Sequence, residues 1–145
     1  MEELIKKNHI AVNVKADNWE EAIREVGKLL IDDNCIDEEY INNMVKSVKE
    51  LGPYIVLTKG FALAHAAPDE EIVHQTSVSL ITLDKPVEFG SPNDPVGVVM
   101  CLACRDHSTH VDSLSNIAKK LMSDGFLNSV SNCTTLEELY RVVNN

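Results

Sequence analysis

Two segments of the sequence concentrate side chains that could do chemistry, and both contain histidine. The first, residues 60–68, holds His65 at the end of an apolar stretch, just before a turn that contains Pro68. In a strand, Phe61, Leu63 and His65 would point to one face. Because the unperturbed imidazole pKa is about 6.5, much of it is neutral and nucleophilic at cellular pH. His65 is therefore a candidate phosphoryl acceptor, although a single histidine at a strand end is more often structural.

The second segment, residues 102–110, joins an apolar strand to the start of a helix and contains His107 and His110. We expect His110 in the first helical turn, beside backbone N–H groups that lack a partner within the helix. Helix N-termini favour anions, so His110 is a candidate phosphate contact. Taken alone, each of these histidines is more simply interpreted as a polar surface residue. His9 and His74 lie in unpatterned polar surroundings, and we expect both on the surface.

The same segment permits a metal-site interpretation. Four candidate ligands follow the spacing Cys-x2-Cys-x2-His-x2-His, namely Cys101, Cys104, His107 and His110. Cysteine and histidine are the usual zinc ligands. However, Cys101 and Cys104 fall in a predicted strand, where residues three apart point to opposite faces. We therefore expect no metal, and a small zinc-binding domain is the least favoured alternative.

The elements that must position these segments follow from hydrophobic periodicity and helix start signals. Strands are predicted at 10–15, 54–58, 61–65, 76–83 and 96–104, and helices starting at Asp17, at Asp37, near Thr109 and at Thr134, with a short helical piece at 124–131. Asp17 and Thr134 are each followed three residues later by glutamate, the pattern of a capping box. The segment 96–104 is apolar on both faces, as in an interior strand. This order predicts an α/β fold, a single domain over residues 1–145 with a central mixed β-sheet flanked by helices.

The charge of the chain disfavours several classes of partner. The formal net charge is −10 over 145 residues. Nucleic-acid binding needs clustered Lys and Arg for phosphate contacts, and docking on an anionic membrane needs the same. We therefore expect no nucleic acid and no membrane surface as a partner, whereas a basic protein partner fits.

The motif content points to a protein without a bound cofactor in a reducing compartment. The phosphate-loop signatures of nucleotide-binding proteins are absent, so we expect no nucleotide and no other cofactor. The N-terminus shows no signal-peptide pattern and no apolar run is long enough to insert in a membrane, which predicts a cytoplasmic protein. The four cysteines are expected as free thiols: Cys35, Cys101, Cys104 and Cys133.

Several motifs, taken in order, resemble the type 2 enzyme IIA domains of the sugar phosphotransferase system, which include mannitol, fructose, nitrogen-regulatory and ascorbate types. They are Gly52-Pro-Tyr-Ile-Val-Leu57, Gly60-Phe-Ala-Leu-Ala-His65-Ala66, Pro86-Val-Glu-Phe-Gly90, Asn93-Asp-Pro-Val96, Leu102-Ala-Cys-Arg-Asp106 and His110-Val-Asp-Ser-Leu114. The similarity covers nearly the whole chain and is clearest over residues 52–122. The Gly-Pro-Tyr-Ile-Val stretch is most similar to the ascorbate-type branch. The resemblance implies a mannitol-type enzyme IIA fold.

The resemblance also implies a phosphotransferase that acts in sugar uptake. The histidine-containing phosphocarrier protein would pass a phosphoryl group to the tele nitrogen (Nε2) of His65, and the chain would pass it to enzyme IIB. The membrane enzyme IIC couples this relay to import and is an indirect partner. His110 matches a second histidine of the family, and we expect it to orient or hydrogen-bond the phosphoryl group.

The chain departs from the family pattern beside His65. Many relatives carry proline at the position of Ala64, and ascorbate-type members often carry arginine at the position of Ala67 or Ala66. Such an arginine is a bidentate phosphate donor, and Lys59 is a candidate substitute for it. Two alternatives stay open: a regulatory module that carries phosphate as a signal to a transcription factor or kinase, and a homodimer in place of a monomer.

Overall fold

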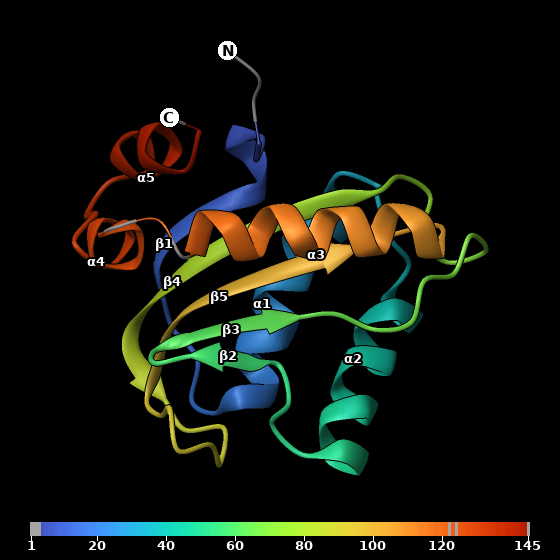
Figure 1. The fold of residues 1–145 in the computed structure, drawn as a ribbon, viewed down its shortest axis with the longest axis horizontal. Coiled ribbons are helices and arrows are strands. Elements are labelled where there is room, and N and C mark those ends of the chain that lie inside the picture. Colours follow the sequence, from blue (N-terminus) through green and yellow to red (C-terminus); the bar gives the residue numbers. More distant parts are fainter. Residues whose placement is uncertain (1–3, 122, 124, 145) are drawn as a thin grey trace.

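The computed structural model describes residues 4–144 apart from 122 and 124, and it is built around one mixed β-sheet (Figure 1). Its strands are β1 (Ile10–Val14), β2 (Val56–Thr58), β3 (Phe61–Ala64), β4 (Ser77–Val87) and β5 (Val96–Ala103). Its helices are the 3-10 helix η1 (Lys7–His9) and the α-helices α1 (Trp19–Asp32), α2 (Glu38–Leu51), α3 (His107–Leu121), α4 (Phe126–Ser131) and α5 (Leu136–Val143). The predicted α/β fold with a central mixed sheet is confirmed.

The strand order in the sheet is β1-β4-β5-β3-β2. Strand β3 runs parallel to β5, and β1 runs parallel to β4. The pairs β4–β5 and β2–β3 are antiparallel. Strand β5 therefore has a neighbour on each side, which agrees with the interior strand expected from its apolar residues on both faces.

Helices cover both faces of the sheet, with α1 and α2 on one face and α3, α4 and α5 on the other (Figure 1). Successive strand residues point to opposite faces. Ala62 and Ala64 therefore lie in the core beneath α1 and α2. Phe61 and Leu63 lie in the core beneath the other three helices. The face that carries Phe61 and Leu63 is the one on which His65 was predicted to lie.

Two helix starts lie one residue later than predicted. The cap of α1 is Asn18, whose side chain accepts a hydrogen bond from the Glu21 backbone N–H at 2.9 Å. Glu21 in turn accepts from the Asp17 N–H at 3.0 Å. The cap of α5 is Thr135, not Thr134. In both cases two good capping residues are adjacent, and local spacing alone did not say which of them has the extended backbone of a cap.

Strand β4 is longer than predicted, because it continues to Val87 through residues that look like a turn. Asp84, Lys85 and Pro86 are exposed, and the register between β4 and β5 shifts between Thr82 and Val87. Proline is tolerated in such an irregular part of a strand, where its missing N–H leaves no ladder bond broken.

His9 is buried, which contradicts the surface position expected for it. Its side chain is 3% exposed, and its Nε2 lies 2.8 Å from an oxygen of Asp33. The partner is distant in sequence, so the polar neighbours of His9 were misleading. His74 is exposed as expected, and its Nε2 lies 2.7 Å from Oδ1 of Asp37.

All four cysteines are free thiols, as predicted, and all four are buried. Within residues 4–121, 123 and 125–144, none of the helices has the length and apolar character needed to cross a lipid bilayer.

Candidate active site

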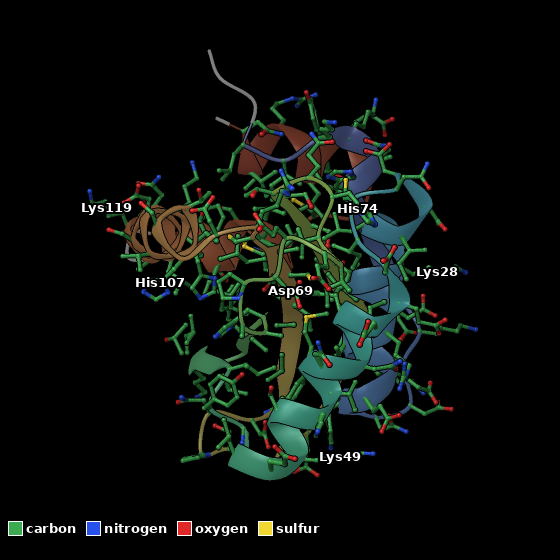
Figure 2. All side chains as sticks on the ribbon, turned by 90° about the vertical axis from the view of Figure 1, so that its right-hand side faces the viewer. Lys28, Lys49, Asp69, His74, His107 and Lys119 are labelled. Carbon is green, nitrogen blue, oxygen red and sulfur yellow. The ribbon has the colours of Figure 1, made fainter. Side chains whose placement is uncertain are left out.

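The parallel pairing of β3 and β5 brings the two chemically interesting segments together. The register pairs Ala64 with Cys101, so both strands end at the same edge of the sheet. His65 follows β3 directly, and residues 104–106 lead from β5 into α3. Sites in α/β proteins commonly lie outside the carboxyl ends of strands. Figure 2 looks onto this edge of the molecule.

The rings of His65 and His110 face one another at this edge. Their centroids are 5.7 Å apart, and the ring planes are inclined by 49°. His65 is half-buried, as is His110. The two histidines that sequence analysis singled out as a pair, 45 positions apart in the printed sequence, are therefore neighbours.

A backbone hydrogen bond defines which nitrogen of His65 is available for chemistry. Nδ1 lies 2.8 Å from the carbonyl oxygen of Leu63. A carbonyl oxygen only accepts, so the proton of the neutral ring must be on Nδ1. The Nε2 atom then keeps its lone pair and is the nucleophilic atom of the ring.

Tyr54 packs edge-on against the ring of His65, a contact that the sequence did not single out. The ring centroids are 5.4 Å apart and the planes are nearly perpendicular at 86°. The Tyr54 hydroxyl donates to the carbonyl oxygen of His65 at 3.4 Å. Tyr54 lies within the Gly-Pro-Tyr-Ile-Val motif, and that motif was the available signal.

Tyr40 of α2 holds the backbone on the other side of His65, and sequence analysis missed this role as well. Its buried hydroxyl donates to the Leu102 carbonyl oxygen at 2.8 Å and accepts from the Ala66 N–H at 3.0 Å. Burial raises the pKa of Tyr40 far above its ordinary value, so the hydroxyl stays protonated. The ends of β3 and β5 are thereby tied together. Tyr40 was predicted only as part of the buried stripe of its helix.

His110 presents an unsatisfied polar atom beside His65. Its Nδ1 is buried and has no hydrogen-bond partner within the described part of the chain. Burial lowers the pKa of His110, and the nearby His65 and His107 lower it further. A buried polar atom without a partner calls for an explanation. The ring that carries this atom lies beside His65, with 5.7 Å between the two ring centroids.

We expected the backbone N–H groups at the start of α3 to be open to an anion, but a side chain of the protein itself binds there. The helix begins at His107, two residues before the predicted start near Thr109. The Asp106 carboxylate accepts from the Thr109 N–H at 2.7 Å and from its hydroxyl at 2.9 Å. These hydrogen bonds lower the pKa of Asp106. A carboxylate therefore already occupies the helix N-terminus, and the phosphate contact expected from His110 must come from its ring.

His107 lies on the outside of α3 and is exposed, as expected (Figure 2). The zinc-binding alternative is wrong, because its cysteines point to opposite faces of the sheet. Cys101 belongs to the core beneath α1 and α2, and Cys104 to the core beneath α3, α4 and α5. Cys101, Cys104, His107 and His110 do not converge.

The residues that depart from the family pattern differ in their surroundings. Ala64 and Ala66 are buried, whereas Ala67 is exposed. Lys59 lies before β3, at the opposite end of that strand from His65. A strand rises about 3.3 Å per residue, so Lys59 is badly placed to replace an arginine beside His65. Arg105 lies between β5 and α3 at the same edge of the sheet as His65, and its Nε donates to the Val73 carbonyl oxygen at 3.1 Å.

Comparisons with known proteins agree on one family. Residues 3–145 match the family described as phosphoenolpyruvate-dependent sugar phosphotransferase system, EIIA 2. An ascorbate-specific phosphotransferase EIIA component from Salmonella choleraesuis is 30% identical over 142 residues, which are 97% of this chain and 92% of that protein.

Solved structures show the same fold. The mannitol-specific cryptic phosphotransferase enzyme IIA of Escherichia coli superimposes with a TM-score of 0.86 at 26% identity, over 97% of this chain and 95% of that one. The enzyme IIA of a mannitol IIA–phosphorylated IIB complex, also from Escherichia coli, gives a TM-score of 0.83 at 22% identity, over 96% of each chain.

Proposed function

The chain belongs to the type 2 EIIA family of the phosphoenolpyruvate-dependent sugar phosphotransferase system, and we propose that His65 is the residue on which it carries the phosphoryl group. As an EIIA component, it is a phosphotransferase of sugar transport. The match over residues 3–145 supports the view that residues 1–145 act as one enzyme IIA domain.

The observation that carries this proposal is the hydrogen bond from His65 Nδ1 to the Leu63 carbonyl oxygen. It keeps the proton on Nδ1 and leaves the lone pair of Nε2 free. In the transfer step, Nε2 attacks the phosphorus atom of a phosphohistidine donor. The new P–N bond forms as the donor's P–N bond breaks. Nε2 has no proton to lose, so the step needs no general base, and the product is phosphorylated at the tele nitrogen.

His110 supports the transfer in this proposal. Its unpartnered Nδ1 belongs to a ring 5.7 Å from that of His65. A phosphoryl group on His65 brings negative charge close to that ring, which favours the protonated form of His110. A protonated ring donates a charge-assisted hydrogen bond to a phosphoryl oxygen. His110 would therefore interact more strongly with phosphorylated His65 than with unmodified His65.

We take the donor to be the histidine-containing phosphocarrier protein and the acceptor to be enzyme IIB, with the membrane enzyme IIC as an indirect partner. The mannitol IIA–IIB complex supports the choice of acceptor, since its IIA shares this fold. Two exposed apolar side chains lie next to the histidines, Tyr54 at 41% and Val111 at 50% exposure. They suit a docking face for protein partners.

The ascorbate-specific relative supports an ascorbate-type substrate for the transport system to which the chain belongs. The four free thiols are consistent with the cytoplasm as the site of the relay. The regulatory alternative uses the same phosphohistidine and stays a prediction. Genes for enzymes IIB and IIC beside the gene for this chain would favour transport.

The test is intact-protein mass after incubation with phosphoenolpyruvate, enzyme I and the histidine-containing phosphocarrier protein. We expect one acid-labile phosphoryl adduct on the wild-type chain and none on His65→Ala. His107→Ala, which changes an exposed histidine on the same edge, serves as the matched control and should be labelled like the wild type. An adduct that persists in His65→Ala would overturn the assignment.

A further inference from the structure

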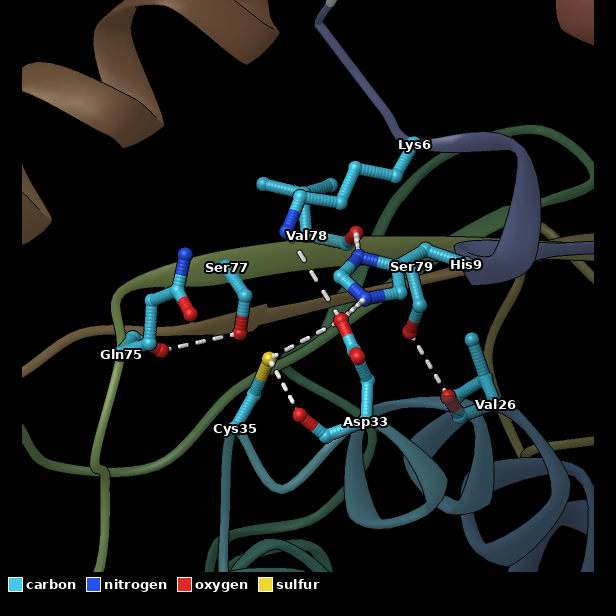
Figure 3. A network of polar contacts seen from close by, with 9 residues as sticks. All are labelled: Lys6, His9, Val26, Asp33, Cys35, Gln75, Ser77, Val78 and Ser79. Atoms are coloured by element: carbon cyan, nitrogen blue, oxygen red, sulfur yellow. Dashed lines mark hydrogen bonds and ion pairs between the residues drawn. The ribbon is translucent and has the colours of Figure 1, made fainter.

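A second cluster of polar side chains lies apart from the His65 site, around the start of β4 (Figure 3). It draws His9 from the end of η1, Asp33 from the end of α1 and Cys35 from the loop before α2. His9 is 3% exposed and Cys35 is 0% exposed. The phosphoryl relay uses none of these residues, and the motifs that resemble the enzyme IIA family do not include them.

The three side chains offer one nitrogen, one oxygen and one sulfur atom as metal ligands, and these atoms lie close enough together to surround a single ion. The candidate ligand atoms all lie within 4.8 Å of one another. Nε2 of His9 is 2.8 Å from Oδ2 of Asp33, and Sγ of Cys35 is 3.8 Å from the same oxygen. Zinc binds such atoms at about 2.0–2.3 Å, which separates tetrahedral ligands by roughly 3.3–3.8 Å. The Nε2–Oδ2 distance is shorter than this range and the Sγ–Oδ2 distance lies at its upper end, so zinc binding would require His9 and Asp33 to move apart.

The orientation of His9 is the one found in metal-binding histidines. Its Nδ1 lies 3.2 Å from the carbonyl oxygen of Val78. A metal-bound histidine typically donates its other N–H to such a carbonyl, which fixes the ring and directs the second nitrogen at the ion. Here the second nitrogen, Nε2, is directed at Asp33 and lies in the same cluster as Cys35.

We propose that His9, Asp33 and Cys35 form a binding site for one Zn²⁺ ion. One imidazole, one carboxylate and one thiolate make a three-ligand zinc site whose fourth position is taken by water. A surface cleft of about 140 Å³ lies beside the cluster, and its lining includes His9 together with Lys6, Gln75 and Ser77.

The charges of the occupied site balance. Cys35 is buried, and burial raises the pKa of its thiol. Zinc is bound by the thiolate, so the thiol proton leaves to solvent on binding. Neutral imidazole, the Asp33 carboxylate, the thiolate and the divalent ion then sum to zero charge.

One cation competes for the site. The ammonium group of Lys6 lies 3.7 Å from Oδ2 of Asp33. Its side chain is 48% exposed, so it can rotate into solvent when an ion takes its place. A bound ion would then connect the N-terminal segment to the loop between α1 and α2, which stabilises the folded chain by mass action.

The test is titration of the purified, metal-free chain with Co²⁺ and competition by Zn²⁺. We expect one equivalent of Co²⁺ to produce a thiolate-to-cobalt charge-transfer band, and Zn²⁺ to remove that band by displacing the cobalt. Cys35→Ala should abolish the band. Cys133→Ala, which removes a buried thiol in the opposite core, should retain it.

A second measurement covers the case in which a cluster variant folds poorly. Zn²⁺ should raise the melting temperature of the wild type and of Cys133→Ala, and should have no such effect on folded Cys35→Ala. Absence of the band in the wild type, or a band that survives in Cys35→Ala, would overturn the proposal. Zinc uptake that is lost in His65→Ala would assign the ion to the His65 site, and this result would also overturn the proposal. None of these measurements depends on phosphoryl transfer.

Discussion

His65 Nδ1 lies 2.8 Å from the carbonyl oxygen of Leu63, two residues earlier in the chain. This short local contact places the proton of the neutral ring on Nδ1. In the proposed mechanism it thereby makes Nε2 the atom that accepts the phosphoryl group. It joins the ring to the backbone at the end of β3. On this proposal, the lone pair of Nε2 is available for transfer before any partner binds.

The first prediction concerns the tautomer of His65. We expect the neutral ring to carry its proton on Nδ1 before phosphorylation and the phosphoryl group on Nε2 afterwards. Nitrogen-detected NMR of histidine-labelled protein distinguishes the two ring nitrogens in both states. His65→Ala identifies the signals. A neutral ring protonated on Nε2 would contradict the proposed mechanism.

The second prediction concerns His110. Replacement by alanine should slow phosphoryl transfer about 10²-fold, the usual effect of removing one donor from a developing charge, while His65 remains a competent acceptor. Transfer rates from the phosphorylated carrier protein would measure this. His107→Ala provides the comparison, and an equal loss in both variants would show that His110 has no specific part.

The third prediction concerns Tyr40. In Tyr40→Phe the Ala66 N–H and the Leu102 carbonyl lose a buried partner, which should lower the free energy of unfolding by about 1–3 kcal/mol. Urea denaturation measures this difference. Tyr54→Phe removes a partly exposed hydroxyl with a long hydrogen bond, and we expect a change below about 0.5 kcal/mol there. Similar losses in the two variants would argue against the bridging role of Tyr40.

The fourth prediction follows from the lowered pKa of His110. The folded state disfavours the protonated ring, so the unfolded chain binds more protons between this lowered pKa and the ordinary value of 6.5. Stability contributed by neutral His110 is thus fully present above pH 6.5 and is lost as the pH falls below that value. Urea midpoints of the wild type and His110→Gln, compared at pH 8 and pH 5.5, isolate the effect. The advantage of the wild type should shrink at the lower pH; an advantage that stays constant or grows would contradict this.

The fifth prediction uses the two alanines after His65. Ala67 is exposed, so Ala67→Arg can be accommodated and could supply a charge-assisted hydrogen bond to the phosphoryl group. We expect transfer about tenfold faster, the scale of one such bond. Ala66→Arg should instead destabilise the fold, because Ala66 is only 5% exposed. Transfer rates and urea midpoints of the two variants test the contrast, and equal behaviour would contradict it.

Much of the fold could be read from local sequence. The alternation in residues 61–65 predicted that His65 shares a face with Phe61 and Leu63, and that face is now seen to carry α3. Hydrophobic periodicity also identified the interior strand and the helices, since burial of one face leaves a pattern within each element. Helix ends were off by one or two residues where adjacent residues compete as caps, as at Asn18 and Thr135.

The sequence by itself indicated His65 and His110 as residues that could react, and it predicted the face of the sheet on which His65 lies. Only the tertiary structure decided which of them meet. The parallel pairing of β3 with β5 places His65 beside His110, and the packing of α2 brings the Tyr40 hydroxyl to Ala66. The burial of His9 against Asp33 has the same origin. These contacts join segments far apart in the chain, and local periodicity carries no information about which strands pair or which loops close.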